Sequence, residues 1–373
     1  MRVQIVDPAA YTPPYDHALS AALARAGADV ELVTCRFPHG PVPVERGYAV
    51  NEFFYRRGSE PGAPGGWAAR RRRALRAAEH LPGMLRHRAH AREADVVHYQ
   101  WLPLPRLDLR LLAPVHPRLF TMHWRFPEPG SRIAGTLRRL LARMDGVVAH
   151  SEHGKARLGT DYGVDPERIE VIPHGAFDYL TRQRHEVPLP EELAAVEGPV
   201  VLAFGLVRPY KGTDLLLEAF RRVEGAELWI VGMPRMPMEP LRELAALAPG
   251  KVRFIERFVT DPEIPAFMRR ADLVALPYHN IEQSGVLYTA LAFGRPLLLS
   301  DVGGFPEVAE LGAARVVPRE DADALATAIR ELLADPAERE RLGRGALAAS
   351  EGRYSWDRIG AQTLALYERL LAG

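Results

Sequence analysis

Two basic residues stand close together where a strand ends and a helix begins. Arg208 and Lys211 lie in a short loop that starts at Gly205 and ends at Gly212, directly after the apolar run 200–204. Backbone N–H groups and the helix dipole already favour an anion at the amino end of a helix. A guanidinium and an ammonium group in this place predict a pocket for phosphate. The alternative interpretation is a pair of solvated surface charges.

A second polar loop follows the apolar run 273–276. In it Glu282 precedes Ser284 and Gly285, which open another apolar helix. Ligands of open α/β sheets bind at the carboxyl ends of the strands. Glu282 could accept hydrogen bonds from a polyhydroxyl ligand, while N–H groups near Ser284 could meet its phosphate. Without a ligand, Ser284 is a helix cap and Glu282 a favourable charge for the dipole, and both interpretations can hold together.

These loops require a layered α/β framework, and the hydrophobic pattern predicts one twice. The first half opens with a buried strand at 3–6, a proline-bearing loop over 7–15, a helix ended by Gly27 and a strand at 30–34. Further strand-like runs follow at 96–99, 119–122, 146–149 and 170–172. The polar stretch 181–198 is interpreted as a linker. A second series then predicts strands at 200–204, 227–231, 252–255, 273–276, 296–300 and 314–317.

Composition narrows the functional classes. The 373 residues exceed one average domain, and Lys+Arg 48 against Asp+Glu 47 gives a net charge of +1, which disfavours a strongly basic nucleic-acid binder. The single cysteine, Cys35, allows no intramolecular disulfide and no zinc ribbon. No apolar stretch is long enough to span a membrane, and Asp7 interrupts the first apolar run before it resembles a signal peptide. We expect a cytoplasmic protein.

The segment Arg70–Arg92 departs from this even charge, because it holds eight arginines and one acid, Glu79. It is either a basic helix that contacts anionic lipid or a solvated face. Pro82-Gly83 is expected to interrupt any single helix there.

Signals for a metal or a dinucleotide are weak. Asp321 and Asp323 imitate a D-x-D motif, but they open an amphipathic helix as first-turn acids. His87 and His90 could share a helix face, yet they lie among arginines without an acid ligand. No G-x-G-x-x-G follows the first strand, so dinucleotide oxidoreduction is poorly supported. No metal and no cofactor are expected.

Several passages, in this order along the chain, resemble the retaining glycosyltransferases of family 4. They are VVAHSEHGKARL, IEVIPHG, FGLVRPYKGTDLLLEAF, ELWIVG, ADLVALPY and SGVLYTALAFGRPLLLSDVGGFPEV. The resemblance implies the GT-B fold, in which two Rossmann-like domains face each other across a cleft. It implies an acceptor-side domain over 1–180, a donor-binding domain over 199–355 and a C-terminal helix, 356–373, that crosses back to the first domain.

The resemblance also implies roles for individual residues. Arg208 and Lys211 match the basic pair that binds the donor diphosphate, and His123 matches a first-domain histidine that faces the donor sugar. Glu282 resembles the first acid of the family's E-x7-E motif, which binds sugar hydroxyls. The expected catalytic residues are therefore His123, Arg208, Lys211 and Glu282. Further donor contacts are expected from Gly205, Ser284, Gly285, Val286 and Thr289.

Two departures from the family pattern stand out. Thr289 occupies the place of the second acid of the E-x7-E motif, which holds the nucleotide ribose, and counting eight on from Glu282 gives Ala290. The glycine-rich loop after the first strand is replaced by the run 12–15, which contains two prolines and so offers few N–H groups. This loop is expected to shape an acceptor pocket, with Tyr11 and Tyr15 on the acceptor side.

The resemblance thus implies a retaining glycosyltransferase that moves a sugar from a nucleotide-diphosphate sugar onto a hydroxyl of a glycan, a lipid-linked or a small-molecule acceptor. The departing nucleoside diphosphate gathers negative charge, which Arg208, Lys211 and the helix start at Ser284 would offset without a metal. Two alternatives remain open: a sugar-nucleotide epimerase or phosphorylase on the same fold, and a non-catalytic nucleotide-sugar binding protein. If Arg70–Arg92 meets lipid, the protein would be peripheral at the inner face of the plasma membrane.

Overall fold

The computed structural model describes residues 1–37, 42, 47–56, 66–123 and 126–373, with the side chains of 66–69 and 72 left aside. The chain divides into two compact units. The first unit comprises residues 1–174 together with 356–373, and the second comprises residues 175–355.

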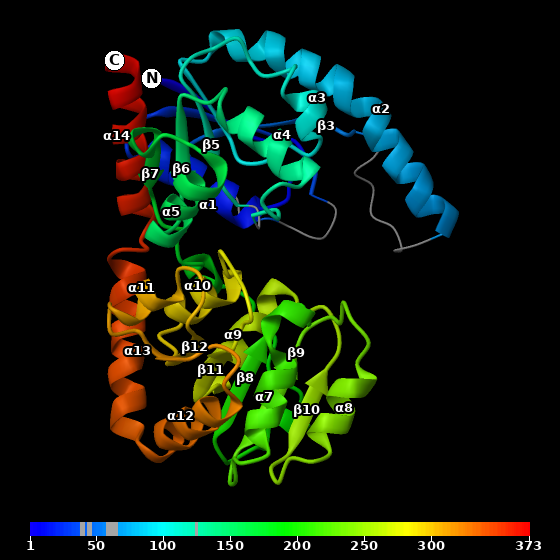
Figure 1. Ribbon diagram of the computed structural model, residues 1–373, viewed down its shortest axis with the longest axis vertical. Helices are drawn as coiled ribbons and strands as arrows, with labels where there is room; N and C mark the ends of the chain where they lie inside the picture. Colours follow the sequence, from blue (N-terminus) through cyan, green and yellow to red (C-terminus); the bar gives the residue numbers. More distant parts are fainter. Residues whose placement is uncertain (38–41, 43–46, 57–65, 124–125) are drawn as a thin grey trace. The chain divides into compact units, whose positions relative to one another are not determined.

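The first unit is built on a seven-stranded parallel sheet with the order β3-β2-β1-β4-β5-β6-β7 (Figure 1). Its strands are β1 (Arg2–Asp7), β2 (Asp29–Cys35), β3 (Ala49–Phe54), β4 (Val96–Tyr99), β5 (Arg118–Thr121), β6 (Gly146–Ala149) and β7 (Ile169–Val171). Val3 pairs with Val30 on one side and with Val96 on the other, so the strand order reverses its direction at β1. Crevices at such switch points bind ligands in open α/β folds.

Helices cover this sheet, and the last helix of the chain is one of them. They are α1 (Pro13–Arg25), α2 (Gly66–His90), α3 (Pro105–Asp108), α4 (Arg132–Leu141), α5 (Glu152–Tyr162) and α14 (Trp356–Ala372), with short 3-10 turns at Ala91–Glu93 and Pro166–Arg168. A Cβ added to Gly360 would lie 2.8 Å from the backbone of Ala22, so α14 packs tightly on α1. The expected return of the C-terminal helix to the first domain is confirmed.

The proline-bearing loop is shorter than the sequence suggests, because α1 already begins at Pro13. Pro13 and Pro14 occupy its first turn, where the N–H groups that proline lacks have no partner within the helix. The expectation of a loop reaching to Tyr15 is therefore wrong at its last three residues.

The expected break at Pro82-Gly83 is also wrong, since α2 runs from Gly66 to His90 through both residues. A Cβ on Gly83 would lie 2.7 Å from the ring of Phe54, so the helix packs against β3 at this point. Met84 beside it is fully buried. Packing of this face compensates for the backbone hydrogen bond that Pro82 cannot donate.

The second unit repeats the plan with a six-stranded parallel sheet, in the order β10-β9-β8-β11-β12-β13. Its strands are β8 (Val200–Phe204), β9 (Glu227–Val231), β10 (Val252–Ile255), β11 (Leu273–Leu276), β12 (Leu297–Ser300) and β13 (Ala314–Val317). Its helices are α6 (Glu191–Ala194), α7 (Thr213–Phe220), α8 (Glu239–Ala245), α9 (Ile264–Arg270), α10 (Gly285–Ala292), α11 (Phe305–Ala309), α12 (Ala322–Ala334) and α13 (Pro336–Glu351), with 3-10 turns at Asp178–Arg182, Pro209–Lys211 and Asp261–Glu263. The switch point of this sheet lies between β8 and β11.

Candidate functional site

The loop after β8 lies at the switch point of the second sheet and is pressed against the end of β11. Gly212 has φ +62°, and a Cβ there would lie 1.9 Å from the carbonyl oxygen of Pro277. Gly205 has φ +89°, and its added Cβ would lie 2.8 Å from Lys211 Nζ. Only glycine allows both the backbone conformation and this close approach.

Lys211 points back into this loop. Its Nζ donates to the carbonyl oxygen of Phe204 at 3.2 Å and lies 5.4 Å from the centroid of the Tyr278 ring. Burial lowers the pKa of Lys211 to about 8, and Arg208 nearby also disfavours its charge. An ammonium group has three N–H donors, of which the carbonyl takes one. A phosphate that received the others would also restore the pKa of Lys211 towards its usual value.

The start of α10 lies beside the same ring. The Ser284 hydroxyl accepts from the backbone N–H of Leu287 at 3.4 Å and lies 3.3 Å from the hydroxyl of Tyr278. Val286 in its first turn is 3.0 Å from the position of a Cβ on Gly205. The structure thus brings Gly205, Lys211, Ser284 and Val286 together around Tyr278. This small cluster joins the loop after β8 to the helix that follows β11.

The remaining predicted donor residues differ in their exposure to solvent. Arg208 is exposed, Gly285 is exposed and Glu282 is half-buried. Thr289 is buried, and its hydroxyl donates to the carbonyl oxygen of Gly285 at 2.9 Å within α10. This residue therefore offers no carboxylate for a ribose.

At the carboxyl edge of the first sheet, His123 lies among other histidines and aromatic rings. Its Nδ1 is 3.2 Å from His150 Nε2, and its Nε2 is 3.0 Å from the Gln100 side-chain oxygen. The Trp101 ring stacks on the His123 ring with 5.5 Å between the ring centroids. The Tyr15 ring meets it edge-on with 4.7 Å between the centroids. Burial lowers the pKa of His123 well below its usual range, and the neighbouring histidines add to this effect.

The two tyrosines predicted on the acceptor side differ in exposure. Tyr11 is 54% exposed and meets the Trp101 ring edge-on at 5.2 Å. Tyr15 is 2% exposed and packs against Trp356 of α14 as well as His123. Tyr15 therefore belongs to the core that supports the edge, while Tyr11 is accessible to a ligand.

The sequence did not predict a buried pair of carboxyl groups, Asp7 at the end of β1 and Asp16 in α1. The Asp7 carboxylate accepts the backbone N–H groups of Ala9 at 3.0 Å and Tyr11 at 2.6 Å. Burial raises the pKa of Asp7, and it raises the pKa of Asp16 further because Asp7 faces it. The N–H groups that a glycine-rich loop would offer to a phosphate thus bind an internal carboxylate. The only signal in the sequence is an acid directly after a strand, followed by a second acid in the next helix.

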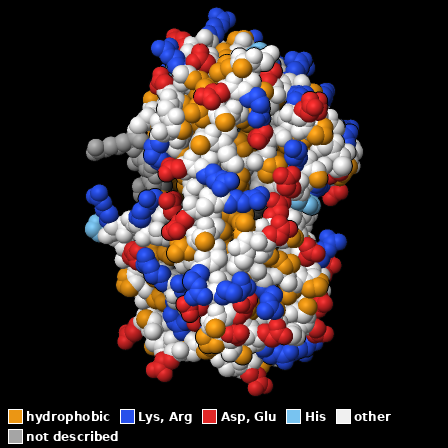
Figure 2. All heavy atoms as spheres, turned by 90° about the vertical axis from the view of Figure 1, so that its left-hand side faces the viewer, with side chains coloured by type: hydrophobic (Ala, Val, Ile, Leu, Met, Phe, Trp, Pro, Cys, Tyr) orange, Lys and Arg blue, Asp and Glu red, His pale blue; other side chains and the backbone are white. Residues whose placement is uncertain are grey.

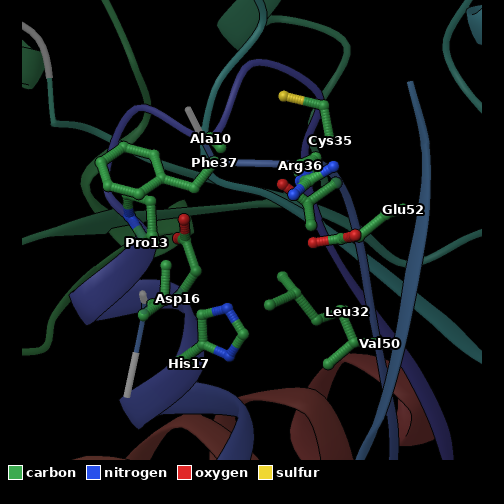
Figure 3. A pocket seen from close by; sticks show the side chains of 12 residues that line it. Ala10, Pro13, Asp16, His17, Leu32, Cys35, Arg36, Phe37, Val50 and Glu52 are labelled. Atoms are coloured by element: carbon green, nitrogen blue, oxygen red, sulfur yellow. The ribbon is translucent and has the colours of Figure 1, made fainter. Parts of the chain in front are cut away.

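A cavity of about 550 Å³ opens beside this acid pair. Figure 3 shows Asp16 of α1, Glu52 of β3 and Arg36 after β2 around the same space, with His17 below them. Pro13 also lines it. A cavity therefore lies beside the run 12–15, which the sequence predicts to shape a pocket, and its wall holds both acidic and basic groups.

One face of the molecule carries both basic and acidic side chains. On the face in Figure 2, Lys and Arg side chains are interspersed with Asp and Glu side chains. Ion pairs between such groups include Arg341–Glu338 and Arg369–Glu170. Among the residues that the structure describes, no helix is long and apolar enough to cross a bilayer. Within the same residues, no group of three His, Cys, Asp or Glu side chains could hold a metal ion.

Comparison with known proteins agrees with this architecture. The family model described as Glycosyltransferase Family 4 matches residues 15–176, and the model described as Glycosyl transferases group 1 matches residues 198–335. A D-inositol 3-phosphate glycosyltransferase of Xylanimonas cellulosilytica is 30% identical, over 94% of this chain and 89% of that protein. The chain belongs to glycosyltransferase family 4. This enzyme is therefore a retaining glycosyltransferase that takes its sugar from a nucleotide sugar.

Solved structures show the same fold for this glycosyltransferase. Sucrose-phosphate synthase from Thermosynechococcus elongatus superposes with a TM-score of 0.73 at 21% identity, covering 100% of this chain and 99% of the other. HepE of Anabaena, in complex with UDP and glucose, superposes with a TM-score of 0.72 at 20% identity, covering 99% of this chain and 100% of the other. The predicted GT-B fold is confirmed, and with it the two Rossmann-like sheets.

Proposed function

We propose that the second unit of this glycosyltransferase binds the diphosphate of a UDP-sugar through Lys211, Arg208 and the amino end of α10. The position of Lys211 carries the proposal: a partly desolvated ammonium group at the β8–β11 switch point, above Tyr278 and beside the capped helix start. UDP is chosen because HepE, of the same fold, was solved with UDP and glucose.

Lys211 and Arg208 would act mainly on the leaving group. As the bond between the sugar and the β-phosphate breaks, negative charge gathers on the departing oxygen, and fixed positive groups stabilise it more than the ground state. Glu282 would bind hydroxyls of the donor sugar. His123 in the first unit would face that sugar, and retention of configuration is the property of the family.

The test compares Lys211→Ala with Lys211→Arg in a transfer assay with UDP-sugars. We expect the alanine variant to lose turnover by at least about a hundredfold, because a charged hydrogen bond contributes about 1.5–3 kcal/mol and more where water is excluded. The arginine variant should retain part of it. Assays run in EDTA and then in excess Mg²⁺ test whether the protein's own cations suffice. Near-wild-type activity of Lys211→Ala would refute the assignment, and donor conversion without acceptor would indicate an epimerase instead.

The acceptor side is proposed to be the first unit. The cavity of about 550 Å³ between α1, β2 and β3 is large enough for a small polyol or one sugar ring. Asp16, Glu52 and Arg36 in its wall can donate to and accept from hydroxyl groups. Glu52→Gln should raise the acceptor KM while leaving the donor KM unchanged, and an effect on the donor alone would place the acceptor elsewhere.

We also propose peripheral contact with anionic lipid through the segment Arg70–Arg92, which would place the enzyme at the inner face of the plasma membrane. On α2, Leu81 is 44% and Leu85 is 50% exposed, and arginines flank them in the sequence. Basic helices with exposed apolar side chains bind such surfaces. Flotation with anionic and with neutral vesicles tests this contact, with Leu81→Ser/Leu85→Ser as the variant and the exposed Leu347→Ser of α13 as the control. Equal flotation of wild type and variant would refute the contact.

A further inference from the structure

His123 is one member of a chain of polar contacts along the carboxyl edge of the first sheet. His150 Nδ1 lies 2.9 Å from the carbonyl oxygen of Ile172, and His150 Nε2 lies 3.2 Å from His123 Nδ1. His123 Nε2 lies 3.0 Å from the oxygen of the Gln100 side chain. These four residues follow four neighbouring strands, β4 to β7, so the sheet itself sets their spacing.

The carbonyl of Ile172 determines where the protons lie. A carbonyl oxygen only accepts, so His150 must carry its proton on Nδ1. Burial lowers the pKa of His150 to about 4, which keeps its ring neutral and its Nε2 without a proton. His123 must then donate from Nδ1 to that nitrogen. A neutral His123 consequently has an unprotonated Nε2, which can only accept.

The orientation of the Gln100 amide conflicts with this result. Its oxygen faces His123 Nε2, and both atoms can only accept a hydrogen bond. Its nitrogen points instead to a buried position without a hydrogen-bond partner, and the residue is 0% exposed. Turning the amide by half a turn exchanges two groups of nearly equal size. The nitrogen then donates to His123 Nε2, and the amide oxygen takes the buried position without a partner. An unsatisfied carbonyl oxygen costs less there than an unsatisfied NH₂ group.

We propose that Gln100 and His150 are positioning residues that hold His123 as the neutral Nδ1–H tautomer, with the Gln100 amide nitrogen facing His123 Nε2. The alternative that keeps the amide as placed requires an imidazolium at His123. Among the described residues, His98, His150 and His174 act on the pKa of this ring, Tyr15 meets it edge-on and Trp101 stacks on it, and none of these supplies a negative charge to pair with an imidazolium.

A neutral ring suits the proposed reaction, and this part of the inference rests on the proposed function. Positive charge develops on the sugar as the nucleoside diphosphate leaves. An imidazolium beside it would oppose that charge, whereas a neutral imidazole does not. Gln100 and His150 would thereby keep the sugar side of the site free of cationic charge.

The direct test reads the tautomer by long-range ¹H–¹⁵N correlation on ¹⁵N-histidine-labelled protein, with the His123→Gln variant to assign the signals. We expect His123 to show a protonated Nδ1 and an unprotonated Nε2 near pH 7. A protonated Nε2 in the wild-type enzyme would overturn the proposal, whatever the enzyme's activity.

Gln100→Glu gives the second test, because a carboxylate only accepts and so requires a proton on His123 Nε2. With Nδ1 already donating to His150, the ring becomes an imidazolium paired with the new carboxylate, and the pKa of His123 rises into the neutral range. We expect kcat near pH 7 to fall at least about tenfold with a smaller change in the donor KM, and to recover as the pH rises. Gln362→Glu, the same change on α14, serves as the control.

The outcomes separate the two hypotheses. An unshifted pKa of His123 in Gln100→Glu overturns the positioning role. The expected tautomer and pKa together with unchanged kcat would support the positioning role and refute the placement of His123 beside the sugar. Gln100→Met removes both amide groups at similar size; it should leave Nε2 unbonded and restore most of kcat relative to Gln100→Glu. If Gln100→Glu does not fold, the tautomer of the wild-type enzyme alone decides.

Discussion

Raising the pH above neutral should weaken donor binding, because Lys211 loses its proton more easily than an exposed lysine does. Its pKa is lowered to about 8, chiefly by partial burial of its ammonium group against the loop after β8. A diphosphate binds the ammonium form, so the apparent dissociation constant should rise by the factor by which that form is depleted. This factor is about 1.1 at pH 7, about 2 at pH 8 and about 11 at pH 9.

Calorimetric titration of UDP from about pH 7 to about pH 9 measures this factor directly. The terminal phosphate of UDP has lost its last proton below this window, so it contributes little to the change. Lys211→Arg is the matched control, since a guanidinium stays protonated and its curve should be flat. Lys211→Ala should bind UDP about 10- to 100-fold more weakly at pH 7, again without this pH dependence.

Two results would refute the reasoning about Lys211. A wild-type dissociation constant that stays level up to about pH 9 would mean that no group with a pKa near 8 binds the diphosphate. An equal rise in Lys211→Arg would show that another group titrates.

Three further substitutions and one control substitution test the framework. Gly212→Ala should destabilise the protein by more than about 2 kcal/mol in chemical denaturation, because its Cβ meets a carbonyl at 1.9 Å. Gly225→Ala, with φ +72° but open space around it, should cost only about 1–2 kcal/mol, and equal losses would refute the steric argument. Asp16→Asn should raise the thermal midpoint near neutral pH and make the midpoint less dependent on pH. The folded state raises the pKa of Asp16, so the wild-type protein loses stability as the pH rises through that pKa, and asparagine does not titrate. A lower midpoint of Asp16→Asn would contradict this reasoning. Tyr367→Phe should lower stability by about 1–3 kcal/mol, since it leaves the buried His98 Nδ1 without its partner at 2.6 Å, and an unchanged midpoint would refute this.

The sequence predicts most of the framework because parallel strands buried on both faces appear as continuous apolar runs. All six strands of the second sheet lie within one residue of their expected bounds. The edge strand β3 (Ala49–Phe54) was not predicted, since it lies at the edge of the sheet beside β2 and only Phe53 and Phe54 of its six residues are buried. The continuous helix through Pro82 depends on the contact of Gly83 with Phe54, which local propensity cannot show.

For the candidate site too, the sequence predicts the residues that share one loop and not those that meet only through the fold. Arg208 and Lys211 belong to a single loop, so their spacing alone predicts an anion site. Gln100 and His150 each follow a different strand and meet His123 only through the order of the sheet. A polar residue after each of several parallel strands is the signal that could have joined them, because carboxyl ends of neighbouring strands share one edge.

The two units treat charge in opposite ways, and this division follows from what a glycosyl transfer requires. In the second unit, the half-buried Lys211 donates to the carbonyl oxygen of Phe204, and an anionic diphosphate would stabilise its charged form. In the first unit, burial lowers the pKa of His98, His123 and His150, which keeps the three imidazoles neutral, and it raises the pKa of Asp16, which disfavours the charged carboxylate. A leaving diphosphate gains from a fixed cation, whereas a cation would oppose the positive charge that develops on the sugar and a neutral imidazole does not. Reversing either arrangement, by Lys211→Ala in one unit or Gln100→Glu in the other, should therefore slow transfer for different electrostatic reasons, the first through the leaving group and the second through the sugar.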